Sequence, residues 1–488
     1  MSGLEYGLEY KETPLIGHAE LQELLDRALA DYGVPGAQVG VVAPVGGSGI
    51  TSDGGALAAD TVWSGIVNKT TGYPVQRDTL FQIGSISKIW TTALAMQLID
   101  EGKLSLDTRV KDVLPDFRII NSPEITYGCT IRHLMCHTNG IEGDAFPSTL
   151  GRGDDCVAKY VDYIGRFPAR TPLGGPLSYS NGAFVVLGRV VEVLRGMTWD
   201  AALRKYLAEP CGFDHVWTLP EDVLRYSSAL GHYRAVANDR QIFPAPVEPT
   251  DTWQLPRSSG PCGQVSASIG DLLGFATLFL NGGVAPNGTR VLSAHSAGLM
   301  TQEQVSLREQ GIENVGWALG WQLPNWGDEP AFGHGGATEG QRANIVVFPN
   351  RRIVVATLTN ADAGTQMAAH IAREITGRAG IAVPPAVELS DRRLTAEEIA
   401  NIVGVYERHE EHQEYREGGP TGVLGIFAPD PDDGPYGVEL TLPLHATEQG
   451  YYAVQRPDQR TPTEIAFVRA SDGRRYVASG HRVTPKVA

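Results

Sequence analysis

Cysteine is scarce in this sequence, and its scarcity excludes one class of small protein. The 488 residues contain five cysteines, scattered along the chain: Cys129, Cys136, Cys156, Cys211 and Cys262. An odd, widely spaced set is not the disulfide framework that holds small secreted domains together. The cysteine content therefore suits a reducing compartment.

Long apolar runs and an excess of basic residues are also missing. No apolar stretch approaches the length that crosses a bilayer, and the first residues lack the basic segment and apolar run of a signal peptide. The formal net charge is −16, which disfavours nucleic acid and anionic membrane surfaces as partners. We therefore expect a soluble, cytoplasmic protein.

The length and composition predict a globular chain with more than one domain. With 42% hydrophobic and 20% charged residues, the chain can form two or three domains and a large core. Strand patterns occur on both sides of a mostly helical region at about 104–271, namely at 37–43, 62–68, 317–321, 331–337, 343–348 and 353–359. We therefore predict one α/β domain, built from two distant segments, with an inserted helical lobe.

The last hundred residues have a different pattern. A proline-rich segment at 384–394 is typical of a linker. A short helix at 395–402 follows it, and beyond this helix short strands alternate with turns. Residues 395–488 therefore predict a small all-β domain, either an antiparallel sheet or a barrel.

The most informative stretch runs from Phe81 to Ile99. Strand character ends at Gly84, and from Ile86 onward apolar residues cover nearly the whole circumference of a buried helix. Ser85 then lies at the positive end of this helix, and Lys88 lies one turn later on the same face. The pair offers a nucleophile, a base and helix N–H groups near an oxyanion. A helix-capping serine beside an unrelated lysine is the alternative interpretation.

Two other clusters invite a metal-binding interpretation. His133 and His137 are four residues apart with Cys136 between them, but no third ligand has matching spacing, so buried, hydrogen-bonded histidines are favoured. Within Arg408–His412 the two histidines are three apart rather than four, which favours a solvated charged stretch. The sequence therefore implies no metal and no organic cofactor.

Three motifs in order along the chain give the sequence its resemblance to a known family. They are Ser85-x-x-Lys88, Tyr179-x-Asn181 at the entry to another buried helix, and His334-Gly335-Gly336. Together with the segments 79–88, 98–107 and 131–141, they resemble the penicillin-recognising serine hydrolases. The most similar branch contains class C β-lactamases, DD-peptidases and related esterases, and the resemblance covers residues 15 to 380.

The resemblance implies a β-lactamase-like α/β fold, with an antiparallel sheet flanked by helices. Residues 1–383 would form this serine hydrolase domain, with the helical lobe at about 104–271 inserted into it. After the linker at 384–394, residues 395–488 are similar in position to the barrel or lipocalin-like modules that some members append.

The resemblance also implies the roles of the motif residues. Ser85 would be the nucleophile, and either Lys88, which burial would make less basic, or Tyr179, whose pKa nearby cations could lower, would be the general base. The sequence leaves that choice open. Asn181 would bridge Lys88 and the acyl-side amide of the substrate, and the N–H groups of Ser85 and Ala337 would form the oxyanion hole.

The third motif departs from the family pattern. Many relatives have Lys-Thr-Gly or His-Thr-Gly there, and the threonine hydroxyl helps to bind the substrate carboxylate. This chain has Gly335 in the middle and His334, charged only part of the time near neutral pH, in first place. We therefore expect an esterase, amidase or D-amino-acid-directed peptidase, with a β-lactamase or DD-carboxypeptidase as the alternative.

A non-catalytic sensor or scaffold with the same fold is the alternative of a different class. Against it, every motif residue is present. The expected partner is a small ester, amide or short peptide that contacts Asn181, His334, Gly335, Gly336 and Ala337, and the sequence leaves formation of a homo-oligomer open.

Overall fold

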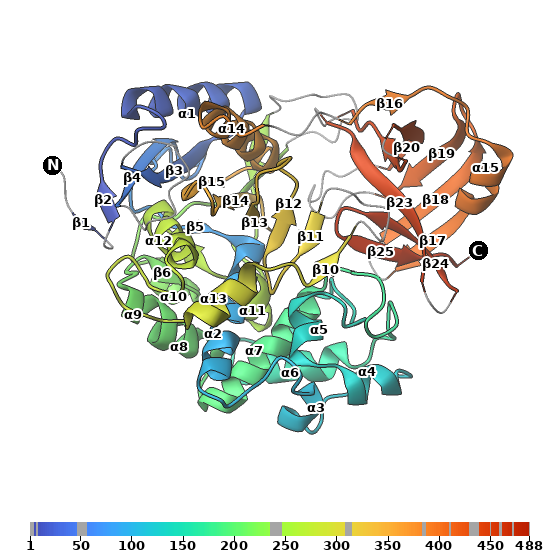
Figure 1. The fold of residues 1–488 in the computed structure, drawn as a ribbon, viewed down its shortest axis with the longest axis horizontal. Helices are drawn as coiled ribbons and strands as arrows, with labels where there is room; N and C mark the ends of the chain where they lie inside the picture. Colours follow the sequence, from blue (N-terminus) through green and yellow to red (C-terminus); the bar gives the residue numbers. More distant parts are fainter. Residues whose placement is uncertain are drawn as a thin grey trace.

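A ten-stranded sheet forms the centre of the computed structural model (Figure 1). The structure describes residues 4–5, 8–45, 56–234, 246–307, 315–382, 387–408, 411–428, 439–448, 450–457, 461–470 and 473–487. The order of the sheet is β1 (Leu4–Glu5), β2 (Leu8–Tyr10), β4 (Leu57–Gly65), β3 (Gly36–Pro44), β15 (Ile353–Thr359), β14 (Gln341–Phe348), β13 (Phe332–Thr338), β12 (Gln322–Pro324), β11 (Val315–Trp317) and β10 (Val305–Ser306). Neighbouring strands are antiparallel except β2 and β4. This confirms the predicted α/β fold and the joining of two distant segments in one sheet.

Helices cover both faces of this sheet. On one face, α1 (His18–Tyr32) and α14 (Gly364–Arg378) pack their apolar sides against the strands (Figure 1). On the other, α2 (Ser87–Asp100) and α12 (Ile269–Leu280) belong to the larger core that continues into the helical lobe. Trp90 on α2 stacks on Phe275 of α12 with ring centroids 3.8 Å apart. The buried helix predicted after Ser85 is therefore confirmed.

The predicted helical lobe is present between α2 and α12. Its helices are α3 (Val110–Val113), α4 (Pro123–Gly128), α5 (Ile131–Met135), α6 (Cys156–Ile164), α7 (Asn181–Arg195), α8 (Trp199–Leu203), α9 (Glu209–Cys211), α10 (Pro220–Val223) and α11 (Gly260–Gly263). All of them are short except α6 and α7. Short strands accompany them: β6 (Val216–Trp217), β7 (His232–Arg234), β8 (Val247–Pro249) and β9 (Ser266–Ala267), and β9 pairs with β5 (Phe81–Gln82), which precedes α2. After the lobe, α13 (Ala294–Thr301) leads back to the main sheet.

We call residues 387–487 the C-terminal module. It contains α15 (Ala396–Ile402), a six-stranded sheet and a four-stranded sheet. The larger sheet is formed by β16 (Leu389–Ser390), β21 (His445–Thr447), β22 (Tyr452–Val454), β23 (Thr463–Arg469), β24 (Arg475–Ser479) and β25 (Arg482–Pro485). The smaller is formed by β17 (Gly404–Arg408), β18 (Glu411–Gly418), β19 (Gly422–Phe427) and β20 (Leu440–Pro443).

The module is all-β as predicted, but its described strands do not close into a barrel. An isolated bridge between Tyr406 and Lys486 joins the two sheets at one edge. At the other edge, no ladder joins β16 to β20 within the described residues. Of the predicted linker, residues 384–386 lie outside the described part, and Leu389–Ser390 form β16 because they pair with β21.

The module shares a core with the main domain. An apolar cluster joins Leu177, Tyr179 and Trp317 to residues of the module, among them Tyr476 and Val483. Next to it, the Tyr179 N–H donates to the His481 carbonyl over 2.8 Å. The module is therefore packed directly against the segment that carries the second motif.

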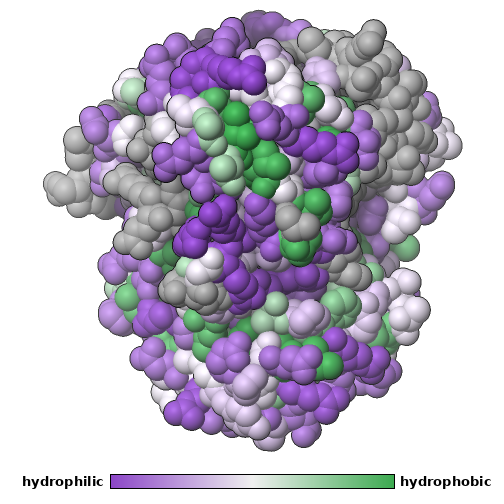
Figure 2. All heavy atoms as spheres, turned by 90° about the vertical axis from the view of Figure 1, so that its right-hand side faces the viewer, coloured by the Kyte–Doolittle hydropathy of each residue, from purple (hydrophilic) through white to green (hydrophobic). Residues whose placement is uncertain are grey.

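On the face that Figure 2 shows, which includes the module, hydrophilic residues predominate and apolar residues lie in small groups. Within the described ranges, every helix is too short or too polar to span a bilayer.

Two glycines allow the nucleophile turn to approach β13 closely. Gly84 has a positive φ of 51°, and a Cβ placed there would lie 2.6 Å from the Ala337 nitrogen. A Cβ on Gly336 would lie 2.0 Å from the Ile83 carbonyl oxygen. Only residues without a side chain therefore fit where this turn meets the strand.

We predict that Gly336→Ala lowers the free energy of unfolding by about 1–3 kcal/mol, because the added methyl group would collide with rigid backbone. Gly335→Ala is the matched control, since the nearest heavy atom to its Cβ would be 4.0 Å away. Urea unfolding of the three proteins measures the difference. Equal destabilisation by both substitutions would contradict the packing argument.

Candidate active site

Ser85 and Lys88 lie together at the start of α2, as the sequence predicts. Ser85 is in a 3₁₀ turn, Gly84–Ile86, that runs directly into the helix. Lys88 Nζ donates to Ser85 Oγ over 3.0 Å and to the Cys262 carbonyl on α11 over 2.8 Å. The lysine side chain is fully buried, and no carboxylate of the described residues forms an ion pair with it. The amine therefore points at the hydroxyl, and the lysine side chain is shielded from water.

This environment changes the proton affinity of Lys88. Its pKa is lowered to about 8, mainly by burial; the positive charge of Arg482 also lowers it, whereas Cys262 and Asp144 act in the opposite direction. The neutral amine is therefore about a tenth of the population at pH 7 and about half at pH 8. That is the form that can accept the proton of a serine hydroxyl.

Tyr179 lies beside the lysine, but its pKa is shifted opposite to the expectation. Its ring centroid is 4.7 Å from Lys88 Nζ, and its hydroxyl has no hydrogen-bond partner among the described residues. Burial raises the pKa of Tyr179 well above its ordinary value, although the neighbouring Ser85 hydroxyl and the Arg482 guanidinium oppose this. The phenol therefore stays protonated, because desolvation outweighs the nearby cations.

His137 positions the second motif and does not form part of a metal cluster. It accepts the Ser180 N–H at Nδ1 over 2.9 Å, and its ring stacks on Tyr179 at a centroid distance of 4.4 Å. His133 points elsewhere and caps α5 together with Thr130. Across the described ranges, no group of three or more potential ligands is placed to hold a metal ion.

His334 lines the cleft on β13, but it does not carry the partial charge expected of it. Its Nδ1 lies 2.5 Å from the Gly335 carbonyl oxygen, which can only accept, so Nδ1 carries the proton. Burial lowers the pKa of His334 to about 3, and Lys88 and His481 contribute. The imidazole is therefore neutral near neutral pH, and its Nε2 is a hydrogen-bond acceptor.

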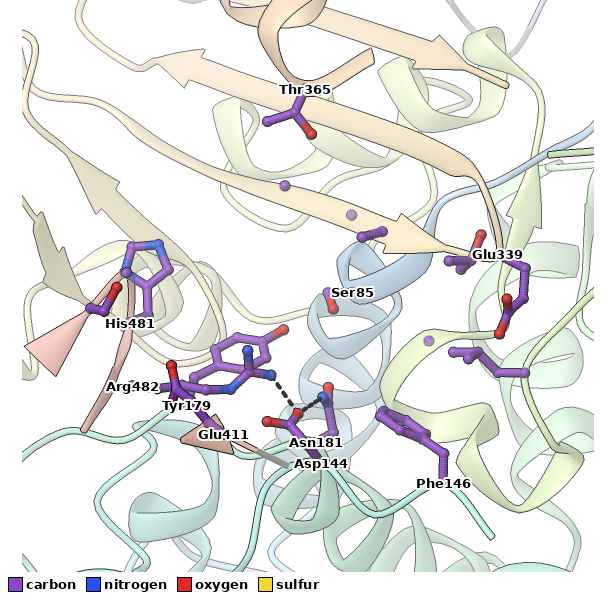
Figure 3. Close-up of a pocket in the computed structure, with 18 of the residues that line it drawn as sticks. Ser85, Asp144, Phe146, Tyr179, Asn181, Glu339, Thr365, Glu411, His481 and Arg482 are labelled. Atoms are coloured by element: carbon purple, nitrogen blue, oxygen red, sulfur yellow. Dashed lines mark hydrogen bonds and ion pairs between the residues drawn. The ribbon is translucent and has the colours of Figure 1, made fainter. Parts of the chain in front are cut away.

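Asn181 reaches a different partner from the predicted one. Its amide nitrogen donates to Asp144 Oδ1 over 2.9 Å, whereas Lys88 bonds Ser85 and Cys262. The predicted contact between Asn181 and Lys88 is therefore not formed in this structure, because the Lys88 amine donates to the Ser85 hydroxyl and the Cys262 carbonyl instead. In Figure 3, the Asn181 oxygen is directed toward Ser85.

The C-terminal module contributes side chains that the sequence did not indicate. Arg408 and Arg482 both form ion pairs with Asp144, and His481 lines the same cleft. The stretch predicted to be solvated, Arg408–His412, instead faces the site: Arg408 is largely buried and His412 lines the cleft, while His409 and Glu410 lie outside the described residues. No local motif marks these residues, because they act through contacts distant in sequence.

A large cleft joins these groups (Figure 3). It has a volume of about 1030 Å³ and exposes Ser85, Tyr179 and Asn181 together with Gly335, Gly336 and Ala337. All lysines and arginines that line it within the described chain come from the module, namely Arg408, Arg456 and Arg482. The main domain lines it with the acidic residues Asp144, Glu248, Asp251 and Glu339. The module also contributes one carboxylate, Glu411, so the cations of the cleft come from the module and most of its carboxylates from the main domain.

Comparison with known proteins found proteins of similar sequence. Residues 21–379 match the family model described as Beta-lactamase. Penicillin-binding protein 4 of Amycolatopsis lactamdurans is 40% identical over 394 residues, which cover 80% of this chain and 98% of that protein. Esterase EstB of Burkholderia gladioli is 32% identical over 165 residues, covering 30% of this chain and 41% of that protein.

Similar solved structures extend the comparison to the whole fold. The crystal structure of SurE has a TM-score of 0.72 at 21% identity and covers 96% of this chain and 99% of its own, and a second structure contains D-Leu. The D-amino acid amidase of Ochrobactrum anthropi SV3, complexed with D-phenylalanine, has a TM-score of 0.58 at 19% identity, covering 74% and 96% of the two chains.

The lowered pKa of Lys88 predicts how reaction at Ser85 depends on pH. Because the base form of the lysine is required, the rate should rise about tenfold per pH unit below pH 8 and level off above it. The measurement is the second-order rate of acylation by an activated ester between pH 5.5 and 9.5. A midpoint between pH 6 and 7, the range of an ordinary histidine, would contradict the assignment of Lys88.

Proposed function

Since the chain belongs to the beta-lactamase family of serine hydrolases, we propose that it cleaves an ester or amide bond in a short peptide or small acyl compound through an acyl-enzyme on Ser85. The observation that carries the proposal is the 3.0 Å hydrogen bond from Lys88 Nζ to Ser85 Oγ in a buried site. A desolvated amine aimed at a serine hydroxyl is an arrangement for making a nucleophile.

The residues support a balanced two-step reaction. Ser85 Oγ attacks the carbonyl carbon while its proton passes to Lys88, and the carbonyl oxygen takes the electron pair between the N–H groups of Ser85 and Ala337. The bond to the leaving group then breaks, the leaving group takes the proton of the Tyr179 hydroxyl, and the proton held on Lys88 replaces it. In the second step water gives a proton to Lys88 as its oxygen attacks the acyl carbon; the ester bond to Ser85 breaks, the acid is released, and the proton passes from Lys88 to Ser85 Oγ.

We assign the base role to Lys88 and the donor role to Tyr179. The pKa of Lys88, about 8, leaves the amine able to accept a proton, whereas the raised pKa of Tyr179 keeps the phenol protonated. The free Tyr179 hydroxyl can donate to the leaving group as it departs. The proposal thus takes Lys88 as the base, where the sequence left both residues open.

The cleft supports a short peptide as the substrate class. Its volume of about 1030 Å³ is at the upper end of the range for small-molecule sites, and charged groups of both signs line it. The D-Leu and D-phenylalanine held by two proteins of similar fold favour substrates with a D-residue. The neutral His334 and the missing hydroxyl at Gly335 disfavour a β-lactam carboxylate as the natural ligand.

Penicillin binding is the second candidate, because a relative with 40% identity is named a penicillin-binding protein. Penicillin binding also forms an acyl-enzyme on Ser85, but water then hydrolyses that acyl-enzyme slowly. A panel of p-nitrophenyl esters, D-amino-acid p-nitroanilides and nitrocefin separates the candidates. A slow, stoichiometric reaction with nitrocefin alone would favour penicillin binding over hydrolysis of peptides or esters.

Intact-mass spectrometry after treatment with a fluorophosphonate tests the nucleophile. We expect one adduct on the wild-type chain and none on Ser85→Ala, which should keep its fold because Ser85 is at the cleft surface. The absence of an adduct on the wild-type protein would favour a non-catalytic scaffold. An adduct on Ser85→Ala would show that another residue is the nucleophile.

The donor role of Tyr179 predicts a dependence on the leaving group. Tyr179→Phe should lower hydrolysis of amide substrates by about 10²–10⁴-fold, because an amine leaves only after protonation. Turnover of p-nitrophenyl esters should fall much less, since p-nitrophenolate leaves without a proton. The ratio of the two kcat/KM values measures the effect, and an equal loss for both substrates would contradict the role.

A further inference from the structure

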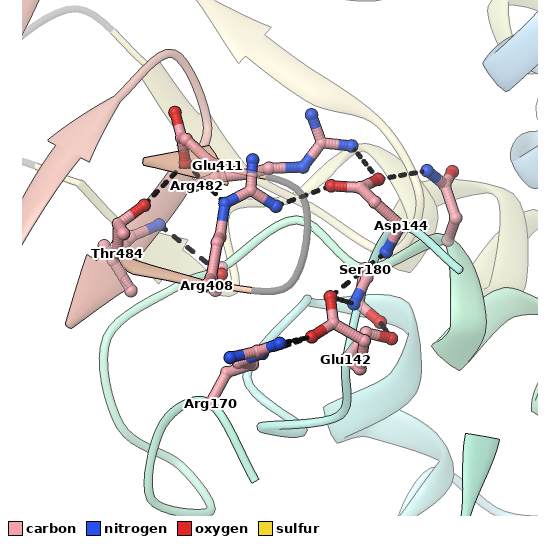
Figure 4. A network of polar contacts seen from close by, with 12 residues as sticks. Glu142, Asp144, Arg170, Ser180, Arg408, Glu411, Arg482 and Thr484 are labelled. Atoms are coloured by element: carbon pink, nitrogen blue, oxygen red, sulfur yellow. Dashed lines mark hydrogen bonds and ion pairs between the residues drawn. The ribbon is translucent and has the colours of Figure 1, made fainter. Parts of the chain in front are cut away.

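Asp144 is the meeting point of the main domain and the C-terminal module (Figure 4). Its buried carboxylate accepts from Arg482 Nη2 over 2.5 Å, from Arg408 Nη1 over 2.6 Å and from Asn181 Nδ2 over 2.9 Å. Burial alone would raise the pKa of Asp144, but the two arginines and the hydrogen bonds hold it below its ordinary value. The carboxylate is therefore ionised and fully occupied by donors.

Both sides of this contact are held by further interactions. On the main-domain side, Glu142 pairs with Arg170 and accepts the Gly143 and Asp144 N–H groups over 2.8 and 3.3 Å. On the module side, Glu411 pairs with Arg408 and accepts the Thr484 hydroxyl over 2.6 Å. Asp144 is therefore fixed in position from two directions.

This arrangement determines which end of the Asn181 amide faces the cleft. A carboxylate can only accept hydrogen bonds, so the amide nitrogen must point to Asp144. The amide oxygen then points into the cleft toward Ser85, where it has no partner among the described residues (Figure 3). An acceptor at this place suits an N–H group on the acyl side of the substrate.

We propose that Asp144 is a positioning residue through which the C-terminal module determines substrate selectivity at Ser85. Arg408 and Arg482 hold the carboxylate, the carboxylate orients Asn181, and Asn181 presents an acceptor to substrates with an acyl-side N–H. The inference depends on the proposed acyl-enzyme at Ser85.

The network also contributes charge to the site. The groups that face Lys88 from the packed elements are Cys262, Tyr179, His137, His334, Asp144 and Arg482. Among the charged members of the network, Arg482 lowers the pKa of Lys88 and Asp144 raises it. Removing either charge should therefore move the acid limb of the pH profile, and in opposite directions.

The first experiment compares two matched p-nitrophenyl esters. One is the ester of N-acetylglycine, and the other is the ester of O-acetylglycolic acid, in which an oxygen replaces the acyl-side N–H. One hydrogen bond should give the wild-type enzyme a preference of about three- to tenfold in kcat/KM for the first ester. Asp144→Asn and Asn181→Ala should each remove most of that preference, and the double variant should remove no more.

The second experiment measures the pH profile with the same esters. Arg482→Gln should shift the acid limb to higher pH, and Asp144→Asn should shift it to lower pH. Arg416→Gln is the matched control, because Arg416 pairs with Glu414 on the surface of the module and does not reach Asp144. We expect the control to keep both the wild-type profile and the wild-type preference. If Asp144→Asn does not fold, Arg482→Gln alone still tests the shift and the loss of preference.

The outcomes separate this inference from the proposed function. If the wild-type chain forms no adduct at Ser85 and cleaves neither ester, the proposed function fails. If the chain cleaves both esters but Asp144→Asn keeps the preference, the positioning role is overturned. It is also overturned if Asp144→Asn lowers kcat/KM equally for both esters, whether or not Asn181 is present. Shifts of the acid limb in the same direction would likewise overturn it.

Discussion

The burial of one amine without a carboxylate partner is the constraint on which the active site depends. In the described part of the chain, Lys88 Nζ has the Ser85 hydroxyl and the Cys262 carbonyl as its hydrogen-bond partners and no carboxylate, so desolvation keeps its pKa near 8. Burial of this amine costs free energy, and the fold tolerates the cost because the main core packs against α2 on all sides. The close contact at Gly84 and Gly336 then sets the nucleophile turn against β13. The same apolar packing thus stabilises the fold and activates the serine.

How much of the structure can be predicted from the sequence depends on how far apart in the chain the interacting residues lie. The buried helix after Ser85, the Ser85–Lys88 pair and the hairpin of β14 and β15 are visible because periodicity and spacing are local. The protonation of Tyr179 and His334 is not visible, because it depends on burial in the fold: burial outweighs the effect of Arg482 on Tyr179, and it acts together with Lys88 and His481 on His334. The Asp144 network is hidden for another reason: its members come from the helical lobe and the C-terminal module, which are far apart in the chain.

The C-terminal module is therefore closer to the active site than its position in the chain suggests. A linker predicts a separate unit, yet the module shares an apolar cluster with Tyr179 and Trp317 and donates two arginines to Asp144. The structure of SurE covers 96% of this chain, so the similarity in fold extends into the module. The sequence match to Penicillin-binding protein 4 covers 80%.

The contact between Asp144 and Arg482 also imposes an order on the making of the protein. The two residues are 338 positions apart, and Arg408 follows Asp144 by 264 positions. At roughly 5–20 residues per second, the ribosome adds these arginines on the order of ten seconds to a minute after the carboxylate. During that interval Asp144 has no counter-charge, and the buried position it later occupies would be costly. The Ser85–Lys88 pair lies within residues made early, whereas the Asp144 network that positions Asn181 is completed only after the module has been made.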